Sequence, residues 1–146
     1  MAKTDVNQII DTVEEFYKKM PPLPKKWNEA IVSITPIIAL VFGVIGILVA
    51  IAALGVTSML SPLIAIGAGV GVATNGIVGS LLYLIASALL LAAYSGTKAK
   101  KIGGWNFLFY SEAVTIISSL IAFNLGGVIG NLIAFYVLFQ IKPYYK

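Results

Sequence analysis

Two uncharged apolar runs constrain this chain more than any other feature. Residues 30–54 form a run of about 25 residues, and residues 63–94 form one of 32. A helix needs about 20 apolar residues to cross the hydrocarbon core of a bilayer, so each run can span a membrane. A soluble chain with 59 % hydrophobic and 11 % charged residues could not cover its surface with polar groups. The sequence therefore predicts an all-α integral membrane protein.

Turn and charge signals divide the chain into an N-terminal region, 1–24, and a transmembrane domain, 25–146. We expect a four-helix bundle with spans at about 30–54, 72–94, 105–124 and 126–141. Residues 55–62 have the composition of an uncharged turn. The following Gly-rich stretch, 67–76, either ends a half-helix at 62–70 or lies in one long tilted helix. We favour the second alternative because glycines at GxxxG spacing commonly serve helix packing.

The positions of the charged residues predict how the spans are oriented. All ten basic residues are lysines, and they occur between residues 3 and 26, at 95–104 and at the C-terminal end. The turns at 55–62 and 125–127 have none. The positive-inside rule then places both termini in the cytoplasm of a multi-pass protein of the inner cell membrane. Because the lysines flank apolar runs, we expect the bilayer as partner and no nucleic acid.

The N-terminal region carries an amphipathic pattern at 4–20. Its apolar positions recur at helical spacing: Val6, Ile9, Ile10, Val13, Phe16, Tyr17 and Met20. Acids dominate the opposite face, whereas helices that bind anionic lipids carry a basic one. We therefore expect a cytoplasmic helix that docks on its own bundle or on a neighbouring subunit. The prolines at 21, 22 and 24 end this helix and form a stiff linker.

Glu112 is the acid that lies well inside an apolar span, about 10 Å below Trp105 at 1.5 Å per residue. An acid at that depth is costly unless it is neutral, paired or hydrated, so it should face the bundle. Residues at a similar depth are candidate partners in an ion or proton site: Tyr83, Ser87, Thr115, Tyr136 and a lysine from 98–101. The other interpretation is a polar residue that fixes helix register. Ser119 and Asn131 also match in depth and could bond across the last hairpin.

Composition excludes most catalytic chemistry. The chain has no cysteine and no histidine, which removes thiolate and Ser–His nucleophiles, haem ligation and nearly every zinc site. We therefore expect no catalytic residue, metal or cofactor, and a protein that is not an enzyme. Small and polar residues suited to packing or oligomer contacts are Gly67, Gly71, Gly76, Ser80, Gly126, Gly130 and Asn131.

Two C-terminal segments resemble a group of small, uncharacterised four-span bacterial membrane proteins. They are G-W-N-F-L-F-Y-S-E at 104–112 and L-F-Q-I-K-P-Y-Y-K at 138–146. The resemblance implies four spans and no particular activity. Small multidrug transporters are also similar in size and span number, but their membrane glutamate lies in the first span. Residues 30–54 contain no acid, so that function is not carried over.

Two functional hypotheses follow from these features. The first is a non-enzymatic membrane protein that acts through helix packing, as a homo-oligomer or as an accessory subunit of a membrane partner. It rests on the Gly-rich faces and on the amphipathic N-terminal helix. The alternative is a small oligomeric channel or a proton- or cation-coupled transporter with Glu112 in its pathway.

Overall fold

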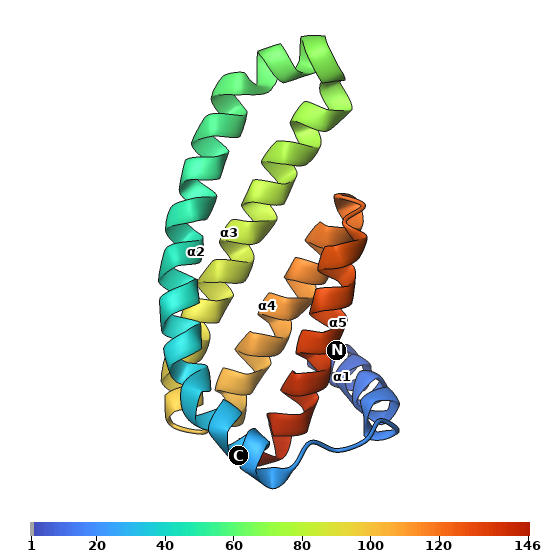
Figure 1. Cartoon of the computed structure of the whole chain (residues 1–146), viewed down its shortest axis with the longest axis vertical. Helices are drawn as coiled ribbons and strands as arrows, with labels where there is room; N and C mark the ends of the chain where they lie inside the picture. The colour runs from blue at the N-terminus through green and yellow to red at the C-terminus, as the bar shows by residue number, and fades with distance from the viewer. Residues whose placement is uncertain (1) are drawn as a thin grey trace.

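The computed structural model describes residues 2–146, with side chains from residue 5 onward, and the secondary structure of this part of the chain is helical. Its elements are α1 (Ala2–Lys18), α2 (Lys25–Ala68), α3 (Val70–Lys98), α4 (Ile102–Ile121), α5 (Leu125–Ile141) and the short 3-10 helix η1 (Lys142–Tyr144). The described residues contain no strand. The all-α prediction is therefore confirmed (Figure 1).

Within residues 2–146, three helices are long and apolar enough to cross a membrane. They are α2, α3 and the continuous segment Leu125–Tyr144 formed by α5 and η1. α4 is not among them, because Asn106, Glu112 and several hydroxyl residues lower its hydropathy. Three such helices in 146 residues indicate a membrane protein.

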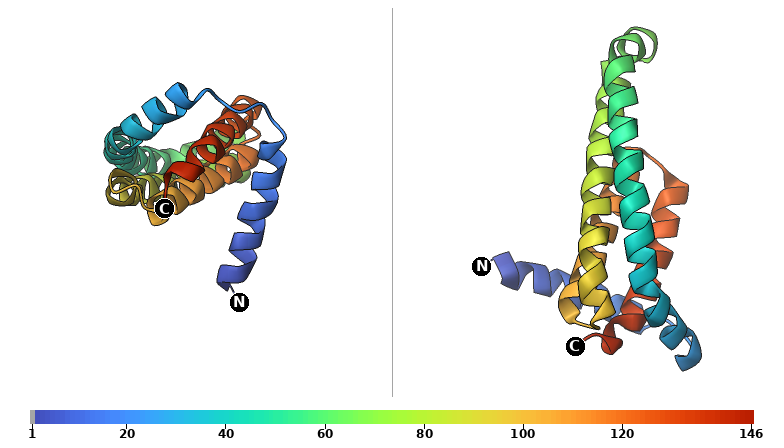
Figure 2. Two further views of the ribbon diagram at one scale, coloured as in Figure 1. Left: turned by 90° about the horizontal axis from the view of Figure 1, so that it is seen from below. Right: turned by 90° about the vertical axis from the view of Figure 1, so that its left-hand side faces the viewer.

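Four long helices run beside one another in the order of the sequence. α2 and α3 form an antiparallel hairpin, α4 packs on α3, and α5 packs on α4. The α2–α3 hairpin extends well past the end of the α4–α5 hairpin (Figure 1). α1 crosses the direction of the long helices and contacts α5 (Figure 2).

The structure corrects the predicted start of the second apolar run. Residues 55–62 are not a turn, and 62–68 is not a separate half-helix, because α2 continues unbroken for 44 residues to Ala68. The chain reverses at Gly69 instead, whose φ of +97° is readily adopted only by glycine. Residues 67–76 therefore do not lie in one long helix, and the alternative that we favoured is also wrong. The other helices begin and end within about four residues of the predicted spans.

α2 tolerates Pro62 because a neighbouring hydroxyl replaces the hydrogen bond that proline cannot make. Pro62 lacks the N–H that would bond to the carbonyl of Ser58. The Ser61 hydroxyl donates to that carbonyl oxygen at 2.9 Å. Local compensation of this kind is typical of prolines in membrane helices. The last part of α2 turns across towards α3 (Figure 1), and Pro62 lies inside α2 rather than at the start of a helix.

Small residues make the contact between α2 and α3. The buried positions of α2 recur every three or four residues: Asn28, Val32, Thr35, Ala39, Gly43, Gly46 and Ala50. A Cβ added at Gly43 would lie 2.8 Å from the backbone of Leu91, and one at Gly46 would lie 2.4 Å from the Ser87 hydroxyl oxygen. We call the row Ala39, Gly43, Gly46 and Ala50 the small-residue seam. It lets the two backbones approach closely.

Large side chains gather where α4, α5 and α1 meet. We call this cluster the aromatic base, and it consists of Tyr17, Trp105, Phe109, Phe135 and Phe139. Trp105 is fully buried, its ring lies 5.3 Å from that of Phe139, and its Nε1 donates to the carbonyl oxygen of Leu138 at 2.8 Å. The base therefore combines ring packing with a satisfied indole N–H.

Candidate functional site

A cleft between α2, α3 and α4 contains most of the predicted ion or proton site. It has a volume of about 320 Å³. Its lining residues are Ile38, Phe42, Tyr83, Ala86, Ser87, Leu90, Ser111, Glu112 and Thr115. Glu112, Tyr83, Ser87 and Thr115 are thus brought together as expected from their depths. Ser111 joins them through its hydrogen bond to α3.

Helical spacing and one cross-helix bond set the geometry of the cleft. Tyr83 and Ser87 lie four residues apart on α3, and Ser111 and Thr115 lie four apart on α4, so each pair shares a face. The Ser111 hydroxyl donates to the Ala86 carbonyl oxygen at 2.8 Å and fixes the two helices at this level. Ala86, Ser87 and Ser111 are buried, whereas Ile38, Phe42 and Tyr83 are exposed at the rim.

Three of the four hydroxyls that line the cleft donate their hydrogens to backbone carbonyls. Ser87 donates to the Tyr83 carbonyl oxygen at 2.8 Å, and Thr115 donates to the Ser111 carbonyl oxygen at 2.9 Å. Ser111 donates to Ala86, as described above. A hydroxyl has one hydrogen and two lone pairs, so each of these oxygens can still accept but not donate. Ser87, Ser111 and Thr115 therefore present acceptors, and the Tyr83 hydroxyl at the rim can also donate.

Glu112 has a buried carboxylate oxygen without a partner. Its Oε2 makes no hydrogen bond within residues 2–146, and the ion pairs found in that part of the chain both belong to Glu14. The expected partner Tyr136 lies elsewhere, because its hydroxyl donates to the carbonyl oxygen of Pro21 in the α1–α2 linker. The nearby lysines do not reach Glu112 either: Lys98 bonds to the Tyr94 hydroxyl at 3.4 Å.

The predicted packing residues divide into two groups. Ser80 is buried, and a Cβ added at Gly76 or Gly126 would lie 3.6 Å from the side chain of Thr57 or of Asn124, respectively. The predicted bond across the last hairpin is confirmed, since Asn131 Nδ2 donates to the Ser119 hydroxyl oxygen at 3.1 Å. A Cβ added at Gly67, Gly71 or Gly130 would meet open space, so these three do not serve packing within the chain.

Sequence reasoning missed the closest glycine contacts. Gly43 and Gly46 lie in the small-residue seam. Gly96 and Gly104 bring α3 and α4 together so tightly that a Cβ at Gly104 would lie 2.3 Å from the Gly96 backbone. The seam had a signal, because Ala39, Gly43, Gly46 and Ala50 recur at helical spacing. In contrast, the sequence does not show whether Gly103 or Gly104 makes the close contact with α3.

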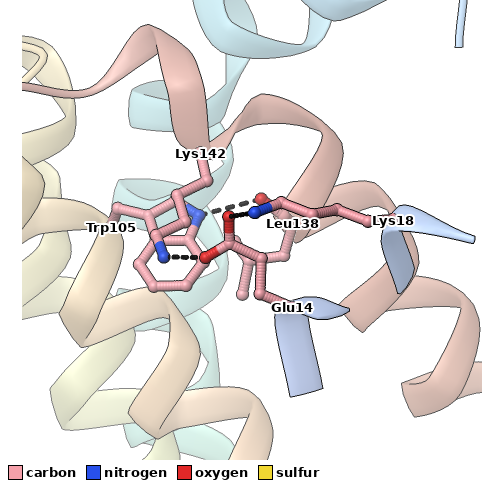
Figure 3. A network of polar contacts seen from close by, with 5 residues as sticks. All are labelled: Glu14, Lys18, Trp105, Leu138 and Lys142. Carbon is pink, nitrogen blue, oxygen red and sulfur yellow. Dashed lines mark hydrogen bonds and ion pairs between the residues drawn. The ribbon is translucent and has the colours of Figure 1, made fainter. Parts of the chain in front are cut away.

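A charged contact fastens α1 to the end of α5 (Figure 3). Glu14 forms ion pairs with Lys142 and, at 3.0 Å, with Lys18, and the Lys142 ammonium lies 5.2 Å from the centre of the Trp105 ring. Burial alone would raise the pKa of Glu14. The hydrogen bonds and charges of Lys142 and Lys18 outweigh that effect and hold it below its ordinary value of 4.5. The same contact raises the pKa of Lys18.

Further bonds join α1 and its linker to α5. The Tyr17 hydroxyl donates to the Leu132 carbonyl oxygen at 3.1 Å, and the Leu23 N–H donates to Gln140 Oε1 at 3.3 Å. The buried side chains of Ile10 and Tyr17 join the core formed by α4 and α5. The amphipathic helix thus docks on its own chain, which was one of the two partners expected for it.

The described residues contain no group of three or more acids, histidines or cysteines that could hold a metal ion. Comparison with known protein families, with curated proteins and with solved structures found no match to this chain.

Proposed function

We propose that this chain is a small membrane protein that crosses the bilayer four times and acts, without catalysis, as a subunit of an assembly. Its partner is a second copy or another membrane protein. The observation that carries the proposal is an uncovered tip on the α2–α3 hairpin.

The lengths of the helices support both parts of this proposal. α4 has 20 residues, which is about 30 Å of helix and matches the hydrocarbon thickness of a bilayer. α2 has 44 residues, which is about 66 Å of helix and roughly twice that thickness. If α4 and α5 match the bilayer, the end of the α2–α3 hairpin lies beyond them.

That end is apolar and has no partner in the described chain. We define the hairpin tip as residues 57–76, in which Thr57 packs on Gly76. Its most exposed large side chains are Met59, Leu63, Ile66 and Val70, with 68–85 % of their surface accessible. The tip has no charge. Large exposed apolar patches mark contact surfaces, so the tip is the proposed site of assembly.

The lysines support a cytoplasmic location for both termini. α2 begins at Lys25, Lys98 to Lys101 connect α3 to α4, and the backbone of Lys146 bonds to Lys100 and Ile102. These lysines therefore share one end of the helices, opposite the uncharged tip. Under the positive-inside rule this end lies on the cytoplasmic side of the inner membrane. Membrane-impermeant labelling of Lys100→Cys and Asn124→Cys in intact cells tests it: only the second variant should react.

Cysteine cross-linking tests the assembly, because the chain has no native cysteine. Ile66→Cys in the tip should form a disulfide-linked dimer, or a covalent adduct with a partner, when membranes are mildly oxidised. Phe123→Cys in the α4–α5 turn is the control, since Phe123 is 90 % exposed but lies outside the tip. Equal cross-linking of both variants, or of neither, would contradict the proposal.

The cleft around Glu112 favours a second candidate function, a small channel or a proton- or cation-coupled transporter. The observation in its favour is the buried, unpartnered Glu112 oxygen among acceptor oxygens. Liposomes containing the protein should show ion or proton flux that disappears in Glu112→Gln. Equal flux with both proteins, or flux with neither, would sink this candidate.

A further inference from the structure

The Glu112 cleft has properties of a ligand site that neither helix packing nor ion leakage requires. Its volume of about 320 Å³ is within the range of small-molecule pockets. It is also about ten times the volume that one water molecule occupies in the liquid. A single ion or proton would leave most of this space unfilled.

The polar atoms of the cleft select the charge and the hydrogen-bonding type of a ligand. Ser87, Ser111 and Thr115 offer lone pairs only, because each has donated its hydrogen to a backbone carbonyl. An ionised Glu112 is likewise an acceptor. A ligand with N–H donors and a positive charge satisfies Glu112 and these three oxygens, while the Tyr83 hydroxyl at the rim can donate as well as accept.

The apolar part of the cleft favours an organic cation over a metal ion. Phe42 and Tyr83 are at its rim, and Ile38 and Leu90 complete an apolar wall. Calcium and magnesium sites usually combine several carboxylate or carbonyl oxygens, whereas this cleft has one carboxylate. Aromatic faces attract ammonium groups, and they also cover the hydrocarbon part of a ligand.

We propose that this cleft binds a small organic ammonium ion, with Glu112 as its counter-charge and the hydroxyl oxygens accepting its N–H groups. The rings of Phe42 and Tyr83 contact its apolar part. This deepens the second candidate function by naming a ligand class for the same site. Ligand binding requires neither flux nor assembly, so the binding proposal and the transport function can fail separately.

Three probes of similar shape test the proposal on the purified full-length protein by titration calorimetry in detergent. Phenethylammonium carries both the charge and the N–H donors. Its N,N,N-trimethyl derivative keeps the charge but has no N–H, and 2-phenylethanol has no charge. We expect saturable binding of phenethylammonium, and binding at least about tenfold weaker for 2-phenylethanol, because a charged hydrogen bond contributes about 1.5–3 kcal/mol.

Two variants assign the contacts. Glu112→Gln should weaken phenethylammonium binding about tenfold or more. Ser87→Ala should weaken phenethylammonium a few-fold but leave the trimethyl derivative unchanged, since that probe has no N–H to lose. Partition of a probe into detergent is the same for the wild type and both variants, so it cancels when their affinities are compared.

Several outcomes would overturn the proposal. They are no saturable binding, equal binding of 2-phenylethanol, unchanged affinity in a Glu112→Gln variant that elutes and melts like the wild type, and displacement of the probe by sodium ions at matched concentration. If Glu112→Gln does not fold, the comparison of the three probes on the wild type still decides. Binding without any flux in liposomes would support this proposal and reject transport.

Discussion

The aromatic base and the small-residue seam hold helices together in opposite ways. In the base, Trp105 and Phe139 fill the space between α4 and α5, and the indole N–H makes a directed bond. In the seam, Gly43 and Gly46 remove side chains so that α2 and α3 touch through their backbones. Lipid tails are as apolar as leucine, so neither contact gains much from apolarity itself. The difference teaches that fit, and not hydropathy, decides which surfaces pair.

Removing Trp105 should be the most damaging single change to the base. Trp105→Ala leaves a large cavity among the rings and deprives the Leu138 carbonyl of its indole donor. We expect a loss of about 3–5 kcal/mol in the free energy of unfolding. Denaturant unfolding in detergent measures it. Trp27→Ala is the control: Trp27 is 65 % exposed, so that variant should stay within about 0.5 kcal/mol of the wild type. Similar losses in both would break the comparison.

Adding a single methyl group should destabilise the small-residue seam, whereas large side chains stabilise the aromatic base. Gly43→Ala places a Cβ 2.8 Å from the Leu91 backbone, which cannot move without shifting α3. We expect a loss of about 1–2 kcal/mol, even though alanine favours helices by about 1 kcal/mol over glycine. Thermal unfolding of Gly55→Ala supplies the contrast, because its Cβ meets open space on the same helix. A Gly43→Ala protein as stable as Gly55→Ala would show that the seam is loose.

Acid should weaken the attachment of α1 to the base. The folded pKa of Glu14 lies below its ordinary value of 4.5, so its stabilising contribution is complete above pH 4.5 and is lost as the pH falls through the lowered value. Glu14→Gln should mimic this loss at neutral pH, at a cost of about 1 kcal/mol. Protease cleavage in the linker at 19–24 reports release of α1. Cleavage rates that are equal in wild type and Glu14→Gln at neutral pH would contradict the role of this ion pair.

The smallest expected effect is at the bond across the last hairpin. Asn131→Leu removes the donor to the Ser119 hydroxyl and should cost about 0.6 kcal/mol, the average for hydrogen bonds between membrane helices. A double-mutant cycle with Ser119→Ala measures the coupling. A coupling near zero would leave α4–α5 pairing to the aromatic base alone.

The sequence was informative wherever one residue type has one physical role. Apolar length and flanking lysines predicted the helices after residue 72 closely. Depth counting along helices brought Glu112, Tyr83, Ser87 and Thr115 to one level, and it paired Ser119 with Asn131.

Other features depend on the neighbouring helix and were not readable from local pattern. Trp105 occurs at the start of a predicted span, yet it is fully buried because α5 covers it. Ser61-Pro62 has the signature of a helix start, yet the Ser61 hydroxyl lets α2 continue through it. Tyr136 has the depth of Glu112, but its position on α5 directs it towards the linker and α1.

The uncharged tip also bears on how the protein enters the membrane. Between Glu29 and Lys98 the chain has no charged residue, so under the proposed topology nothing in the α2–α3 hairpin needs to shed tightly held water during insertion. The chain reverses through the end of α2 and Gly69 (Figure 1), with no charged loop to translocate. The hairpin can therefore enter the bilayer as one unit. Under the proposed topology, the lysines at 98–101 stay on the cytoplasmic side, and α4 begins a second insertion after them.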